Sequence, residues 1–211
     1  MRVQDAYTDW SATYDFDRNL TRDLDQFVTK EVLGGRRFQT VLEAGCGTGK
    51  NTSFFAGLSD YVWALDLSVG MLTQAKAKLY SHRVLLTVAD ITKPWPCKAG
   101  SVQLVTCNLV LEHIQELRPV FVEAHRALAP GGQFLVSELH PFRQYQGTQA
   151  NFQRHDKRIE IAAFIHHLSD FTNAAAQSGL SLQRFQEWWH ETDQNKPPRI
   201  VSFLFEKLRK D

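Results

Sequence analysis

The sequence predicts an α/β fold, a Rossmann-like and mostly parallel sheet with helices on both faces and an antiparallel last strand. Three observations predict it. Apolar strand patterns and helix patterns alternate five times between residues 40 and 138, at the spacing of βαβ units with right-handed crossovers. The first strand pattern ends in a glycine-rich turn. The last two, residues 180–188 and 199–207, have no helix between them, so an antiparallel hairpin is expected at the sheet edge.

The length and composition indicate one domain. The chain has 211 residues, of which 43% are hydrophobic and 22% charged, which suits a sizeable core. Over residues 1–211 we expect an N-terminal helical cap (1–36), a ligand-binding core (40–139), a lid or insert after the fifth strand (140–168), and a C-terminal helix with the hairpin (169–211).

The charge balance and the cysteines exclude several classes of protein. With 24 Lys and Arg against 23 Asp and Glu, the net charge is +1, so a nucleic-acid partner is not expected. No continuous apolar stretch is long enough to span a membrane and no apolar leader begins the chain, which predicts a cytoplasmic protein. Cys46, Cys97 and Cys107 form no C-x-x-C pair, and His166 and His167 have no spaced carboxylate partner, so we expect no metal site.

Residues 5–31 precede the first strand and carry apolar side chains at spacings of three and four, which predicts one or two helices. A polar and aromatic cluster within this segment has a second interpretation. Trp10, Tyr14, Asp15 and Arg18 can fold over a ligand as a cap instead of packing as a structural helix.

The glycine turn follows a short buried strand at residues 40–42 and begins after Glu43. Its glycines, spaced two apart, are Gly45, Gly47 and Gly49. Because glycine lacks Cβ, such a turn adopts positive φ and lets backbone N–H groups approach a ligand closely. A second strand, residues 61–65, ends at Asp66 roughly 20 residues beyond the turn, where these folds place an acid on ribose hydroxyls.

The later elements continue the alternation. Ser68 is expected to N-cap a helix that runs through Tyr80, and Pro130-Gly131-Gly132 stops the helix that ends at residue 128. The other expected elements are a helix at 51–58, strands at 84–89, 101–107 and 133–138, and a helix at 169–178.

Ligands of parallel sheets lie beyond the carboxyl ends of the strands. The polar residues expected at these ends are Glu43, Asp66, Asp90, Asn108 and residues 138–140. From His140 the pattern changes, because residues 141–160 are polar, rich in Gln and Arg, and without a period. This composition predicts an insert or lid beside the site.

Five motifs together resemble the class I S-adenosylmethionine-dependent methyltransferases over residues 40–138. They are V-L-E-A-G-C-G-T-G, A-L-D-L-S followed by Met71, V-A-D-I, N-L-V-L-E-H and L-A-P-G-G. Within that superfamily the chain looks most like the small-molecule branch of ubiquinone/menaquinone C-methyltransferases and malonyl-carrier-protein O-methyltransferases. The resemblance implies a seven-stranded sheet with a reversed last strand, S-adenosylmethionine as cofactor and a small-molecule acceptor.

The resemblance also implies where the donor binds. It places the methionine end against residues 45–49, the ribose on Asp66, the adenine between Leu67 or Met71 and Ile91, and the sulfonium beside Asn108. The implied donor-binding residues are Tyr14, Glu43, Gly45, Cys46, Gly47, Gly49, Thr52, Asp66, Leu67, Met71, Asp90, Ile91, Asn108 and Leu109. Glu43 stands where the family usually has Asp, and the acid is kept.

Methyl transfer from a sulfonium is an in-line displacement, for which the protein mainly aligns the reactants and excludes water. A general base is needed only if the nucleophile holds a proton. The candidate catalytic residues are His140, at the end of the fifth strand, and His113. Their structural alternatives are a hydrogen-bonded turn before Pro141 and a cap that orients the loop after the fourth strand.

The acceptor is less well defined. Arg143, Tyr145, Arg154 and Arg158 in the insert can bind an acidic or aromatic acceptor, free or carrier-bound, or they can face solvent. Three other functions remain open at this point. A nicotinamide-dependent oxidoreductase is disfavoured by the glycine spacing, and an RNA methyltransferase by the lack of a basic excess. A non-catalytic protein that binds S-adenosylmethionine remains compatible with the sequence.

Overall fold

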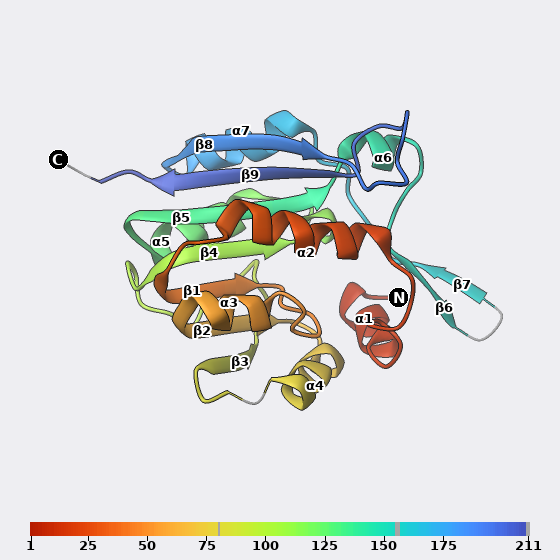
Figure 1. Ribbon diagram of the computed structural model, residues 1–211, viewed down its shortest axis with the longest axis horizontal. Coiled ribbons are helices and arrows are strands. Elements are labelled where there is room, and N and C mark those ends of the chain that lie inside the picture. The colour runs from red at the N-terminus through yellow and green to blue at the C-terminus, as the bar shows by residue number, and fades with distance from the viewer. Residues whose placement is uncertain (80, 155–156, 210–211) are drawn as a thin grey trace.

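A seven-stranded sheet in the order β3-β2-β1-β4-β5-β9-β8 forms the centre of the molecule (Figure 1). The computed structural model describes residues 1–79, 81–154 and 157–209. The strands of the sheet are β1 (Phe38–Ala44), β2 (Ser59–Asp66), β3 (Val84–Val88), β4 (Val102–Asn108), β5 (Leu128–Leu139), β8 (Leu180–Trp188) and β9 (Ile200–Lys207). The pairs β1–β2, β1–β4, β2–β3 and β4–β5 are parallel, and β9 runs antiparallel to both β5 and β8. The predicted sheet, including its reversed last strand, is confirmed.

Helices cover both faces of the sheet, as predicted (Figure 1). The helices are α1 (Val3–Trp10), α2 (Leu20–Leu33), α3 (Thr52–Leu58), α4 (Val69–Lys78), the 3-10 turn η1 (Leu111–His113), α5 (Arg118–Ala127), α6 (Pro141–Tyr145) and α7 (Leu168–Gln177). Side chains of α2 and α3 share one buried apolar cluster with the sheet, and those of α5 and α7 share another. The helix expected to run through Tyr80 ends at Lys78, and Tyr80 itself lies outside the described residues.

The N-terminal segment divides into two parts with different positions. Helix α1 lies beyond the carboxyl ends of the strands, as a cap does (Figure 1). Helix α2 instead packs on the sheet, because Leu24, Val28 and Val32 form a stripe at a spacing of four that is buried in the core. Of the segment expected to form a cap, residues 1–36, α1 thus lies beyond the strand ends and α2 is a core helix.

The insert contains more regular structure than its sequence predicts. It holds the short helix α6 and a two-stranded antiparallel hairpin of β6 (Asn151–Arg154) and β7 (Lys157–Glu160). Phe152 of β6 and Ile161 are buried with Ala6 and Trp10 of α1, and the Phe152 ring stacks on Trp10 with centroids 5.4 Å apart. This contact joins segments that are far apart in the sequence, so no local hydrophobic pattern predicts it.

No helix within the described ranges is long and apolar enough to cross a membrane.

Candidate active site

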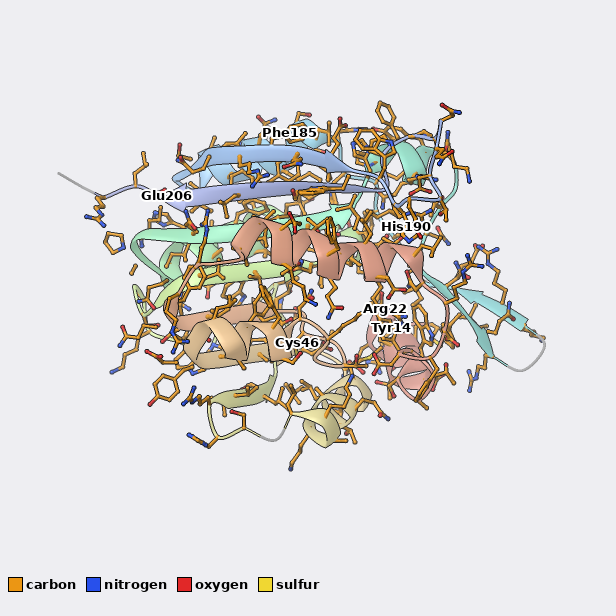
Figure 2. All side chains as sticks on the ribbon, viewed as in Figure 1. Tyr14, Arg22, Cys46, Phe185, His190 and Glu206 are labelled. Carbon is orange, nitrogen blue, oxygen red and sulfur yellow. The ribbon has the colours of Figure 1, made fainter. Side chains whose placement is uncertain are left out.

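A cavity opens at the carboxyl edge of β1, β2 and β4, beneath α1 and the first turns of α2. The predicted residues that line it are Tyr14, Glu43, Gly45, Cys46, Gly47, Asp66, Leu67, Met71, Asp90, Ile91, Asn108, Leu109 and His113. Figure 2 labels Tyr14, Arg22 and Cys46, which line this cavity from the N-terminal segment and the glycine turn. Three other predicted residues, Gly49, Thr52 and His140, do not line it.

The glycine turn is held in a left-handed conformation and packs closely. Gly45, Gly47 and Gly49 have φ values of 83°, 53° and 80°. A Cβ on Gly45 would lie 2.3 Å from Val110 Cγ2, and one on Gly49 would lie 2.8 Å from Leu79 Cδ1. Glycine is therefore required at both positions for conformation and for space.

The turn's amides are used differently from the sequence prediction of a backbone cradle. The N–H groups of Gly45 and Cys46 both donate to Leu65 O, at 2.8 and 2.9 Å. The N–H of Gly47 donates to Asp66 Oδ2 at 2.8 Å. These three amides fasten the turn to β2, so the turn offers a ligand close approach to its backbone rather than free N–H donors.

Asp66 ends β2 with its carboxylate at the cavity wall. Its Oδ1 accepts the N–H of Ser68 at 2.8 Å, and its Oδ2 accepts that of Gly47. Burial raises the pKa of Asp66, although these backbone donors lower it. Each oxygen has two lone pairs, so the carboxylate retains acceptor capacity for hydroxyl groups in the cavity.

Glu43 is an uncharged acid at neutral pH. It is buried, and desolvation raises its pKa to about 8 despite the hydrogen bond that Thr52 Oγ1 donates to its Oε2 at 2.5 Å. Thr52, which was predicted to bind the cofactor, therefore acts by holding Glu43.

Two residues of α2 belong to the site and were missed by the sequence analysis. Asp25 is buried and accepts hydrogen bonds from the amides of Asn108 at 2.8 Å and Asn51 at 2.9 Å. Arg22 is also buried, lies over the Tyr14 ring, and donates to the backbone carbonyls of Asp17 and Tyr14. The available signal was the spacing of Arg22, Asp25 and Thr29, which puts three polar residues on one buried helix face.

Several polar atoms around the cavity are buried without a hydrogen-bond partner. Among the described residues, Asn51 Oδ1 and Asn108 Oδ1 have no hydrogen bond, and Arg22 Nε has none beyond its ion-pair contact with Asp23 Oδ1 at 3.5 Å. All three residues line the cavity. Buried polar atoms are normally satisfied, so this set of one donor and two acceptors indicates a polar ligand.

His113 lines the cavity, and both of its ring nitrogens are engaged. Its Nδ1 lies 2.8 Å from Ala162 O, and its Nε2 lies 2.8 Å from the Tyr7 hydroxyl. A carbonyl only accepts, so Nδ1 carries the proton and Nε2 accepts from Tyr7. Burial lowers the pKa of His113, so the ring is neutral at pH 7. Its position agrees with the alternative prediction that it orients the loop after β4.

His140 does not face the cavity, so its geometry argues against the predicted role as a base. Its side chain is fully buried, Nε2 lies 2.8 Å from Glu187 Oε1, and Nδ1 accepts the N–H of Phe142 at 3.2 Å. The residue is the N-cap of α6. The strand ends at the expected edge, but the side chain turns toward β8, which sequence order does not reveal.

The insert residues expected to bind an acceptor are engaged with other protein groups. Arg143 pairs with Asp193 at 2.9 Å, and Arg154 pairs with Asp9 at 3.1 Å. The Tyr145 hydroxyl is hydrogen-bonded to His167 Nδ1, and Arg158 forms an ion pair with Glu160 at 3.7 Å. None of the four insert residues lines the cavity or the second one that adjoins it.

The second cavity lies on the far side of Tyr7, Tyr14 and Leu109, which line both cavities. Leu109 adopts φ = 55° directly after β4. A left-handed conformation is strained for leucine, and such strain is concentrated at functional sites. The loop is fixed by Glu138, whose Oε1 accepts the N–H groups of Val110 and Leu111, each at 2.9 Å.

Comparisons with known proteins agree with this geometry. A family model described as a methyltransferase domain matches residues 42–136. An uncharacterized methyltransferase of Emericella nidulans is 29% identical over 98% of this chain and 85% of its own length. The malonyl-acyl-carrier-protein O-methyltransferase of Salmonella typhimurium is 39% identical over 48% of this chain and 39% of its own length.

A solved structure shows the same fold. The N-methyltransferase NodS from Bradyrhizobium japonicum, in complex with S-adenosyl-L-homocysteine, superposes with a TM-score of 0.74 at 14% identity, over 99% of this chain and 100% of that chain. The chain spans between 39% and 63% of the length of the malonyl-acyl-carrier-protein O-methyltransferases that it matches. The likeness to these relatives is therefore a likeness to part of each.

Proposed function

We propose that this chain is a class I S-adenosylmethionine-dependent methyltransferase, whose methyl donor is S-adenosylmethionine, and that it methylates a small-molecule acceptor at the junction of its two cavities. The observation that carries the proposal is the set of polar atoms around the first cavity that lack a hydrogen bond. Two amide oxygens are buried there with no hydrogen-bond partner among the described residues, and Arg22 Nε has only an ion-pair contact with Asp23 Oδ1 at 3.5 Å.

These atoms fit the amino-acid end of the donor. Arg22 Nε is a charged donor for a carboxylate, and charge-assisted hydrogen bonds of this kind are strong. The amide oxygens of Asn51 and Asn108, with the Asp25 carboxyl between them, are acceptors for an ammonium group. The site thus has complementary groups for both charges of a zwitterion.

The other wall fits a nucleoside. Asp66 retains acceptor capacity for a ribose diol, and Leu67, Met71 and Ile91 give an apolar slot for a flat base. Asp90 lies at the end of that slot, where an amino group of the base can donate to it. The predicted binding residues Tyr14, Glu43, Gly45, Cys46 and Gly47 complete the wall toward the amino-acid end.

When bound, S-adenosylmethionine supplies a methyl group on a sulfonium, which is a good leaving group. The protein's own residues align the acceptor and exclude water. Leu109, Tyr7 and Tyr14 separate the two cavities, and their positions suit them to orient the acceptor's attack on the methyl carbon. His113 Nε2 accepts a hydrogen bond from the Tyr7 hydroxyl and so fixes the position of Tyr7 at the junction. His113 is therefore a positioning residue that acts through Tyr7.

The acceptor is a small molecule. The relatives named malonyl-acyl-carrier-protein O-methyltransferase support a carrier-bound acceptor as one candidate. Gly49 and Thr52 act indirectly in this proposal, since Gly49 packs the turn on α4 and Thr52 holds Glu43.

Isothermal calorimetry with S-adenosylmethionine, S-adenosylhomocysteine and NAD tests the cofactor class. We expect the first two to bind and NAD to give no heat of binding, because the polar groups of the cavity complement an amino acid, which NAD lacks. Binding of NAD with no response to S-adenosylhomocysteine would contradict the proposal.

A further inference from the structure

Glu112 is a buried carboxyl that lines the second cavity and has no role in the function proposed above. It belongs to the turn η1, is 7% exposed, and receives one long hydrogen bond, from Gln144 Nε2 to its Oε2 at 3.5 Å. Desolvation raises its pKa to about 7, although the Gln144 hydrogen bond lowers it. A buried carboxyl whose pKa lies near neutral pH is suited to act as a general base.

The buried titratable groups nearest to Glu112 carry little charge at neutral pH. The titratable and charged groups that face it are Tyr7 on α1, His113 in the same turn, Glu138 on β5, and Asp17, Arg18 and Arg199 on the walls of the cavity. Burial raises the pKa of Tyr7 and lowers that of His113, so both are neutral, and burial also raises the pKa of Glu138, which disfavours its charged form. The 3.8 Å approach of His113 to Glu112 is therefore not an ion pair.

Of the two arginines that line the cavity, Arg199 is paired with a carboxylate and Arg18 is exposed. The Nε and Nη2 groups of Arg199 donate to both oxygens of Asp193, each at 2.6 Å, and its Nη1 donates to Thr21. Arg18 is exposed to solvent. Among the described residues that line this cavity, no buried cation is left without a carboxylate partner, so an acceptor carboxylate would meet the Glu112 carboxylate and be repelled by its like charge.

The remaining wall is aromatic. Trp10 is stacked between Phe152 and Tyr7, at centroid distances of 5.4 and 5.9 Å, and Tyr14 meets Trp10 edge-on at 4.7 Å. The cavity has a volume of about 530 Å³, which is the size of a small-molecule pocket. A flat ring packs favourably against such a surface.

We infer that the second cavity takes an uncharged aromatic acceptor with an O–H or N–H nucleophile, not a carboxylate, and that Glu112 removes its proton. The inference rests on the proposed function and narrows its acceptor class. The acceptor's lone pair forms the new bond to the methyl carbon, while the carbon–sulfur bond breaks and its electron pair stays on sulfur. Glu112 takes the proton released from the nucleophile and later passes it to water.

The test uses two probes of matched shape, 4-nitrophenol and 4-nitrobenzoate, with the full chain saturated by S-adenosylhomocysteine. Absorbance reports the ionisation of the bound phenol, and calorimetry reports the affinity of both probes. Three proteins are compared: the wild type, Glu112→Gln, and Glu116→Gln, whose side chain is exposed four residues away. Glutamine keeps the size of the side chain and cannot hold the negative charge.

In the wild type the bound phenol and Glu112 share one proton. We therefore expect the phenol to ionise about one pH unit or more higher in the wild type than in Glu112→Gln, because a like charge disfavours ionisation. Glu116→Gln should match the wild type. At pH 8 the wild type should bind 4-nitrobenzoate roughly tenfold more weakly than Glu112→Gln does, for the same reason.

Equal ionisation of the phenol in wild type and Glu112→Gln would overturn the inference, as would tighter binding of the benzoate than of the phenol by the wild type. Failure of both probes to bind also overturns it. A protein that does not bind S-adenosylhomocysteine contradicts the proposed function itself, so the two failures are distinguishable.

Discussion

Asp66 shows how one carboxylate is prepared for a ligand before the ligand arrives. Two backbone N–H groups, from Gly47 and Ser68, hold its oxygens at 2.8 Å. These donors fix the orientation of the carboxylate, so little side-chain entropy is lost when a diol binds. A residue placed in this way is expected to contribute to binding more than to the stability of the fold.

Replacement of Asp66 by alanine should weaken binding of S-adenosylhomocysteine by roughly 10- to 100-fold, since hydrogen bonds to a charged group contribute about 1.5–3 kcal/mol. Calorimetry measures the affinity, and the exposed Asp60 of the same strand, changed to alanine, is the matched control. An unchanged affinity in Asp66→Ala would remove the ribose assignment.

Glu43 gives the fold a pH dependence whose sign can be worked out. Its pKa is about 8 in the folded chain against 4.5 for the free side chain, so the native state binds more protons between those values. Stability from this group is complete below about pH 4.5 and is lost as the pH rises toward 8. Glu43→Gln should therefore be more stable than the wild type at pH 9, by about 1 kcal/mol or more.

Thermal unfolding of both proteins at pH 5 and pH 9 measures this difference. Asp25, Glu112 and Glu138 also have raised pKa values, so the loss of stability at high pH becomes smaller in Glu43→Gln and does not vanish. If the two proteins lose the same stability between these pH values, Glu43 is not the buried neutral acid described above.

At the scale of elements, α2 is both a core helix and part of the site. Leu24, Val28 and Val32 hold it on the sheet, while Arg22 and Asp25 reach the cavity from its first two turns. Its N-cap, Asn19, accepts the Arg22 N–H at 3.0 Å and so fixes the start of the helix. The packing of this apolar stripe on the sheet therefore determines the position of the Arg22 guanidinium in the cavity.

Arg22→Met should lower the affinity for S-adenosylhomocysteine by roughly tenfold or more, because a charge-assisted hydrogen bond to the carboxylate is lost. The affinity for 5′-methylthioadenosine should change little, since that ligand has no amino-acid end. Calorimetry with both ligands separates the two effects. An equal loss for both would show that Arg22 acts through the shape of the cavity instead.

Helix α6 depends on His140 at its N-terminus. His140→Ala should lower the free energy of unfolding by about 0.5–2 kcal/mol, the usual cost of a lost cap, and leave binding of S-adenosylhomocysteine intact. His140→Asn should recover most of the stability, because asparagine also caps well. Denaturant unfolding measures the first quantity and calorimetry the second. A large loss of affinity with normal stability would restore His140 to the site.

For the whole molecule, the sequence is most informative where the chemistry is local. Gly45, Gly47 and Asp66 follow strands within a few residues, so period and turn type were enough to predict their place at the sheet edge. The topology of the sheet was predictable for the same reason. The connections β1–β2, β2–β3 and β4–β5 are short strand–helix–strand units with their own patterns.

The missed features depend on contacts between distant segments. Arg22 and Asp25 enter the site because α2 crosses the sheet, and no motif marks them. The β6–β7 hairpin forms where Phe152 meets Trp10, across more than half of the chain. His140 was expected at the correct edge, but Glu187, which arrives with β8, determines the direction of its side chain.

The walls of the second cavity have a consequence for how such enzymes diverge. Of the described residues that line it, Leu109 and Glu112 fall within the matched region 42–136, and the others come from the N-terminal segment, the end of β5, the insert and the residue before β9. Substitutions in these outer segments, except at Tyr7 and Tyr14, which line both cavities, can alter the second cavity while the first stays unchanged. Most of the wall of the second cavity can therefore be rebuilt without a change to the glycine turn or to Asp66.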